Sequence, residues 1–183
     1  DLIKRNPDSA AVLANKAISL SEVINFIRGL SDGYARLGII EKDRGNFPDA
    51  LRYYRQSLAY RLKMGDKDLL ARIYNNIGNV YSKMGIHDSS AYYMLQALRM
   101  AEALDLEPAR AMYAMNLGIA YEKNRDFDLA IQYIRQARKL YENIRDSAGI
   151  VKCLINESAI FIAQQDYQKA KPLLKRAIIL SGT

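Results

Sequence analysis

The sequence predicts an all-α protein in which antiparallel helix pairs stack side by side as a solenoid. Three observations predict this fold. The same features return every 40 residues over most of the 183-residue chain. Small residues recur in register, in the series Gly38, Gly78, Gly118 and Ser158, the series Ala50, Ser90, Ala130 and Ala170, and the series Ser57, Ala97, Ala137 and Ala177. A large residue recurs between them, at Tyr53, Tyr93, Tyr133 and Leu173. A fixed period in this range is the sequence signature of repeat architectures, whose neighbouring units share one continuous core.

Each period also has an internal order of aromatic, large and small residues. In the second unit this order is carried by Tyr74, Ile77, Gly78, Tyr81, Gly85, Ser90, Met94 and Ala97, and in the third by Leu117, Gly118, Tyr121, Ala130, Ile134 and Ala137. The order resembles the tetratricopeptide repeat, a helix–turn–helix unit, in the 40-residue form of kinesin light chains, Pins-type adaptors and bacterial signalling regulators. The resemblance covers residues 31–183 and implies a right-handed superhelix. Glycine costs about 1 kcal/mol in a helix interior, so three in register indicate that the paired helices approach closely there.

Each unit is expected to contain two helices, here called A and B. The predicted A helices span residues 31–44, 68–83, 107–123 and 147–163, and the predicted B helices span residues 48–64, 87–104, 126–144 and 167–180. The units themselves are 31–66, 67–106, 107–146 and 147–183, within one array that covers residues 1–183. Three B helices are predicted to begin at N-caps, Asn46, Asp126 and Asp166, whose side-chain oxygens can accept first-turn N–H groups. Pro48 fits the first turn that follows Asn46.

The two ends of the array are less regular. Residues 7–28 form a helical pattern that aligns with the second half of a unit. We interpret this segment as the B helix of an array that continues upstream, or else as a divergent capping helix. At the other end, residues 178–180 are apolar, which indicates a chain that continues, self-associates or was cut. In the fourth unit Glu157 and Ser158 replace an apolar residue and Gly, and Pro172 is expected to kink its helix or delay its start.

The composition argues against catalysis and against cofactor or metal binding. The chain has one histidine, His87, and one cysteine, Cys153, and it has no phosphate-binding loop or nucleophile motif. We expect His87 to replace a packing aromatic residue and Cys153 to be a small core residue. No apolar run reaches the roughly 18 residues of a membrane span. One cysteine slightly favours the cytoplasm without excluding export or the periplasm.

The net charge of +7 favours acidic partners through long-range attraction. The basic residues are spread over all helices rather than gathered on one patch, which argues against nucleic acid as the partner.

The candidate site is the A-helix face opposite the apolar seam. In the second unit the seam is Ile73, Tyr74, Ile77, Tyr81 and Met84, and the opposite stripe is Arg72, Asn76, Asn79 and Lys83. The resemblance places A helices on the concave face of the superhelix. The stripe recurs in the other units, and the candidate groove residues are Arg36, Arg72, Asn75, Asn76, Asn79, Met112, Met115, Asn116, Ile119, Lys152 and Asn156.

An asparagine amide carries both donors and an acceptor, so a row of them can pair with the backbone of any extended peptide. Members of the family with 40-residue units use such a row, and the resemblance implies the same here. The alternative is that these asparagines are structural and bridge adjacent A helices. Met112, Met115 and Ile119 are likewise either adaptable apolar contacts or ordinary core residues. Some members grip a terminal carboxylate with two Lys, two Asn and one Arg; Asn75 and Asn156 replace two of those cations here, so we expect no such clamp.

Together these patterns predict a non-catalytic scaffold whose groove binds an extended or helical protein segment, acidic with apolar anchors, within a larger signalling or regulatory protein. The alternative is a structural or oligomerisation module that associates through its exposed terminal helices.

Overall fold

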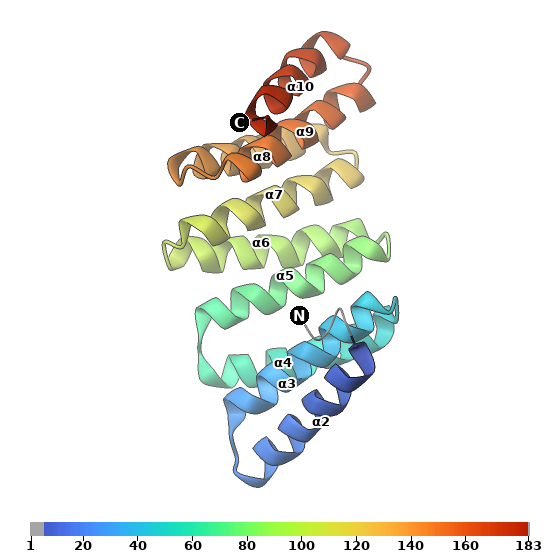
Figure 1. Ribbon diagram of the computed structural model, residues 1–183, viewed down its shortest axis with the longest axis vertical. Coiled ribbons are helices and arrows are strands. Elements are labelled where there is room, and N and C mark those ends of the chain that lie inside the picture. The colour runs from blue at the N-terminus through green and yellow to red at the C-terminus, as the bar shows by residue number, and fades with distance from the viewer. Residues whose placement is uncertain (1–5, 183) are drawn as a thin grey trace.

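The computed structural model describes residues 6–182, and every regular element in that range is an α-helix (Figure 1). In chain order the helices are α2 (Pro7–Val23), α3 (Ile27–Asp43), α4 (Phe47–Met64), α5 (Lys67–Lys83), α6 (His87–Ala103), α7 (Glu107–Lys123), α8 (Phe127–Asn143), α9 (Ser147–Ala163) and α10 (Tyr167–Ser181). They stack from α2 at one end to α10 at the other. Each helix packs mainly on the helices before and after it in sequence. The predicted solenoid of antiparallel helix pairs is confirmed.

The A helices are α3, α5, α7 and α9, and each packs most extensively on the B helix that follows it. Helix bounds in the second to fourth units agree with the sequence prediction to within about two residues at each end. The first unit differs. The structure ends α2 at Val23 and begins α3 at Ile27, so the predicted single helix over residues 7–28 contains a turn that the prediction missed.

A left-handed residue marks each turn, and these residues lie 20 positions apart. They are Asn25, Gly45, Gly65, Gly85, Asp105, Arg125, Arg145 and Gln165, with φ between 51° and 80°. Each half-unit is therefore a helix of nearly constant length followed by the same turn. The missed turn at Asn25 contains neither Gly nor Pro, although asparagine tolerates this conformation.

We expect Gly85→Ala to destabilise the protein by about 1 kcal/mol. A left-handed alanine costs about 1–2 kcal/mol, and the stiffer unfolded chain returns up to about 1 kcal/mol. An added Cβ would meet nothing within 4 Å, so the backbone conformation alone sets the cost. Arg145→Gly should stabilise the protein, because it places glycine at a left-handed position that now holds a side chain. Gly182→Ala is the control: at φ −93° alanine is unstrained, so this change should not lower the urea midpoint. An unchanged midpoint for Gly85→Ala would contradict this account of the turns.

The glycines in helices A lie where the paired helices cross. An added Cβ at Gly118 would lie 2.6 Å from Cγ1 of Ile134 and 3.1 Å from the carbonyl oxygen of Ala130. At Gly78 it would lie 2.8 Å from Cγ of Met94. In the fourth unit the Ser158 hydroxyl donates to the carbonyl of Ile155 at 2.7 Å, so its polar group is satisfied within its own helix.

The structure bears on four of the helix signals in the sequence, three at N-caps and one at a proline. Asp126 and Asp166 accept hydrogen bonds from the backbone N–H groups of Leu129 and Lys169, which confirms both as N-caps. Asn46 occupies the N-cap position of α4, but its amide donates to Asp49 and Glu41 instead of accepting from the helix. Pro172 does not delay α10, which already begins at Tyr167.

Candidate protein-interaction groove

Direct contacts between successive A helices identify the inner face of the array. Helix α3 touches α5, and α7 touches α9, whereas no pair of B helices in the described chain approaches to the same extent. In a curved stack the elements on the inner side are closest together. The A helices therefore line the inner face, and their exposed side chains form its surface.

The predicted stripe is accessible on that face, with graded exposure. Arg36, Arg72, Met112 and Lys152 are exposed, and Asn76, Asn79, Met115, Asn116, Ile119 and Asn156 are half-buried. The opposite seam of α5 is buried at Ile73 and Ile77. Met84, which the sequence places in this seam, is 38% exposed at the C-cap of the helix.

Asn75 departs from the predicted set. It is only 7% exposed, and its side-chain oxygen accepts a hydrogen bond of 2.9 Å from the amide of Asn116. This bond joins α5 to α7, two successive A helices. The pair is therefore a structural bridge of the kind that the alternative interpretation describes, and Asn75 is not available to a ligand.

The other three asparagines are different. Within residues 6–182, the side-chain amides of Asn76, Asn79 and Asn156 form no hydrogen bond with protein groups. They face the inner surface half-buried, with donors and acceptors both unused. Such groups can exchange water for the N–H and C=O groups of a bound backbone at little cost.

The charges on this face are mostly positive. Arg36, Lys83 and Lys152 form no ion pair with another described residue, and Arg72 pairs with Asp68 at 3.0 Å in an exposed contact between successive turns. Exposed pairs of this spacing contribute only about 0.3–0.5 kcal/mol, so Arg72 can be recruited by a ligand carboxylate.

A solvent-open hollow of about 520 Å³ lies at the end of the inner face where A helices begin. Leu104, Leu106, Pro108 and Ala109 supply its apolar part, and the Asp68–Arg72 pair supplies its charged part. Met112 is 39% exposed on the same helix as Pro108, whereas Met115 packs against the core. Of the residues that line the hollow, sequence reasoning names Arg72 and misses the other five.

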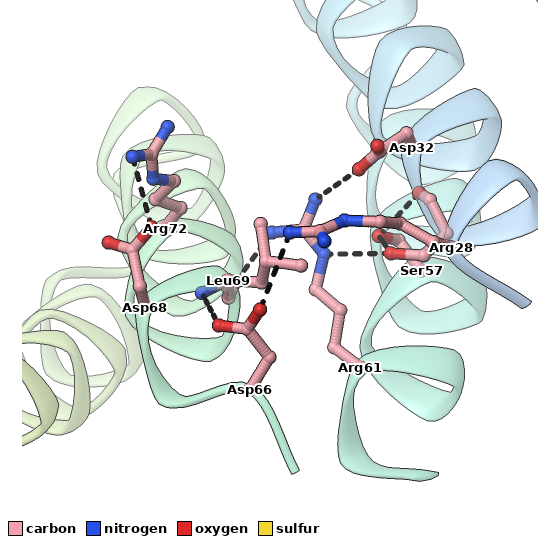
Figure 2. Close-up of polar contacts among 9 residues, drawn as sticks. Arg28, Asp32, Ser57, Arg61, Asp66, Asp68, Leu69 and Arg72 are labelled. Carbon is pink, nitrogen blue, oxygen red and sulfur yellow. Dashed lines mark hydrogen bonds and ion pairs between the residues drawn. The ribbon is translucent and has the colours of Figure 1, made fainter. Parts of the chain in front are cut away.

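A buried arginine fills the corresponding place one unit earlier (Figure 2). Arg61 of α4 is 5% exposed, and its Nε donates to Ser31 Oγ at 2.9 Å. Its Nη1 donates to the carbonyl of Leu69, and its Nη2 lies 3.5 Å from Asp32. Burial lowers the pKa of the guanidinium from its usual value, and Asp32 opposes that shift. Arg61 thus ties α3, α4 and α5 together.

The hydroxyl groups of two serines complete this cluster. Ser57 Oγ donates to the carbonyl of Ser31 at 2.8 Å, and the two hydroxyl oxygens lie 3.3 Å apart. Both serines are fully buried. Just outside, Arg28 reaches Asp66 at 3.5 Å. Helices α4 and α5 pack less extensively than any other successive pair, so polar contacts carry more of the cohesion at this junction.

A second buried ionic cluster lies between α8 and α9. Glu157 is 1% exposed, and its two oxygens accept from Arg135 Nε at 2.6 Å and Arg138 Nη1 at 2.7 Å. One period earlier the equivalents of Glu157 and Arg138 are Leu117 and Leu98, both buried. The departure seen in the fourth unit is therefore compensated by a partner in the third.

The remaining reactive side chains are part of the packing. Cys153 is fully buried, and burial raises the pKa of its thiol to about 12, which keeps it protonated and poorly nucleophilic. His87 is half-buried at the start of α6. Across the described chain, no three His, Cys, Asp or Glu side chains gather as a metal ion would require, and no helix has the length and apolar character of a membrane span.

Comparison with known proteins identifies the repeat. The family model described as tetratricopeptide repeat matches residues 30–103 and 108–178. The chain belongs to the tetratricopeptide-repeat family. Folds of this family are in general non-catalytic scaffolds for protein interaction.

The similar proteins have low sequence identity. The uncharacterized protein Ycf37 of Guillardia theta is 25% identical over 124 residues, which span 66% of this chain and 66% of that protein. A kinesin light chain with nearly identical TPR-like repeats, from Podosopora anserina, superposes with a TM-score of 0.79 at 14% identity, over 98% of this chain and 90% of that one. The Rap conjugation gene regulator of plasmid pLS20, in complex with the Phr* peptide, superposes with a TM-score of 0.73 at 16% identity, over 86% of this chain and 44% of that one. At these identities the structures support the fold alone.

Proposed function

We propose that the inner face of the A helices binds an extended or helical segment of a partner protein, and that this chain is the docking part of a larger signalling or regulatory protein. The observation that carries the proposal is the row of half-buried amides at Asn76, Asn79 and Asn156, which have no partner among the described residues. The Rap regulator, which shares the fold, is bound to a peptide. That likeness supports a peptide as the ligand class.

The charge of the face indicates the character of the partner. Arg36, Lys83 and Lys152 are unpaired within residues 6–182, so an acidic segment would gain attraction and a faster association rate. Apolar anchors would contact Met112 and Ile119, which border the amide row. The protein itself would catalyse no reaction.

The test uses random peptides displayed on phage and selected on the purified chain. For a selected peptide, Asn76→Ala with Asn156→Ala should weaken binding roughly 5- to 150-fold, because each of the two lost backbone hydrogen bonds is worth about 0.5–1.5 kcal/mol. The thermal midpoint should stay unchanged, since neither amide bonds to the protein. Gln56→Ala with Gln132→Ala is the matched control, because it removes two exposed amides from B helices.

Asn116 is left out of this test because its loss would strand the buried amide of Asn75. Unchanged peptide binding by the Asn76/Asn156 variant would show that the amide row does not hold the ligand. A fall in its thermal midpoint would show that these amides are structural.

A second candidate function is self-association through the terminal helices. Ile178 and Ile179 of α10 are each 69% exposed, and Val12, Leu13 and Leu20 of α2 are at least half exposed. Sedimentation at increasing protein concentration distinguishes the two functions. A rising mass that Ile178→Glu abolishes would favour self-association.

A further inference from the structure

The hollow beside Arg72 exists because one junction of the array lacks the cross-links of its neighbour. Five positions of the junction in Figure 2 can be compared with those 40 residues later. Arg28, Asp32, Arg61, Asp66 and Leu69 correspond to Asp68, Arg72, Ala101, Leu106 and Ala109. The earlier set forms the Arg28–Asp66 and Arg61–Asp32 bridges. The later set can form neither, because Leu106 and Ala101 carry no charge.

The junction one unit later is also filled. There Tyr141 takes the place of Arg61 and is 7% exposed. It packs on Gly149, where an added Cβ would lie 2.3 Å from the tyrosine ring. Large and small residues are thus matched at that junction. At the middle junction both members are small, Ala101 and Ala109, and the space outside them stays open.

We propose that this hollow receives the apolar anchor residue of the groove-bound peptide, and that a carboxylate next to the anchor pairs with Arg72. This inference rests on the proposed function and names the subsite that selects the partner. The volume of about 520 Å³ lies in the range of binding sites for small groups. Leu104, Leu106 and Pro108 supply apolar contact, and each leucine is more than a third exposed.

The charge at the rim specifies the neighbouring group. Arg72 and Ala101 replace Asp32 and Arg61, so neither partner of that ion pair is present here, and Arg72 pairs instead with Asp68 of its own helix at 3.0 Å. The Asp68–Arg72 side chains are 36% and 64% exposed. A ligand carboxylate can take the outer N–H groups of Arg72 in a paired geometry that Lys could not offer. The partner is therefore a segment with a bulky apolar residue beside Asp or Glu.

The experiment repeats the phage selection with two variants and their controls. Ala109→Leu, which copies Leu69, should fill the hollow and weaken the selected peptide roughly 10- to 100-fold, the value of one buried large apolar side chain. Ala109→Ser keeps the hollow and should bind as the parent chain does. Arg72→Glu should select peptides that carry Lys or Arg beside the apolar residue. Lys83→Glu, at the far end of the same helix, is the control and should still select peptides with Asp or Glu beside the apolar residue.

The outcomes separate the subsite from the groove. The subsite would be overturned if the selected peptides bind Ala109→Leu normally and if Arg72→Glu still selects an acidic residue beside the anchor. If those same peptides need Asn76 and Asn156, the proposed groove function would remain supported. If the parent chain selects no peptide, both proposals fail.

Discussion

Replacing Glu157 by leucine is expected to destabilise the protein by about 3 kcal/mol, and adding Arg138→Leu to the same chain is expected to restore most of that loss. Both side chains are largely buried: that of Glu157 is 1% exposed and that of Arg138 is 20% exposed. The single substitution therefore leaves a largely buried guanidinium without its carboxylate. Removing one partner of a buried pair costs about 3–5 kcal/mol, while replacing both by apolar residues is often neutral or stabilising.

The array itself shows that the apolar pair fits. Position 157 corresponds to Leu37, Ile77 and Leu117, and position 138 to Leu58 and Leu98. Arg135 is 54% exposed and can turn to solvent when the carboxylate is gone. Urea unfolding of the parent, both single variants and the double variant gives the coupling energy between the two positions. If the two losses of unfolding free energy simply add in the double variant, an apolar pair does not fit this site, and the account would be contradicted.

Replacing Arg61 by alanine is expected to cost about 2–4 kcal/mol, combining a cavity with the loss of one buried and two part-buried hydrogen bonds. The carbonyl of Leu69 would lose the guanidinium donor, and Ser31 would lose the donor that orders its hydroxyl. Arg61→Lys should recover only part of the loss, because one ammonium cannot reach Ser31, Leu69 and Asp32 in the fixed geometry of the guanidinium.

The location of this loss can be measured as well as its size. Helices α4 and α5 pack least extensively of all successive pairs. Without Arg61, faster amide hydrogen exchange should appear first in α2–α4, while α6–α9 keep their protection. Arg52→Ala is the control, because its pair with Asp49 is exposed and lies within one helix. Uniform loss of protection along the whole array would contradict a junction-specific role for Arg61.

The sequence predicts the repeat well because the repeat follows from local rules. Small residues at helix crossings and left-handed turn residues recur at a fixed interval, and aspartates cap α5, α8, α9 and α10. The turn at Asn25 was missed because it has no Gly or Pro, yet it lies 20 residues before Gly45 and could have been found from the period alone. Helix interiors and family membership were therefore readable, whereas the first boundary was not.

The candidate site was less predictable, because it depends on pairs of residues from different units. Asn75 and Asn76 are neighbours with the same side chain, but Asn75 is buried against Asn116, whereas Asn76 is half-buried on the inner face. The hollow depends on Ala101 and Ala109 being small together. Comparing the junctions position by position at the 40-residue interval would have detected the two alanines, and inspection of one unit could not.

The uniform spacing of the turns also bears on how such an array can change length. A gene that loses the codons for residues 107–146 would still join a turn to an identical turn, and the backbone would continue without a misfit. The side chains would not agree so easily. Glu157 would then lie against Leu95 and Leu98 in place of Arg135 and Arg138, with its charge buried and unpaired. The backbone of this array permits recombination between units, while the chemistry of its junctions fixes their order.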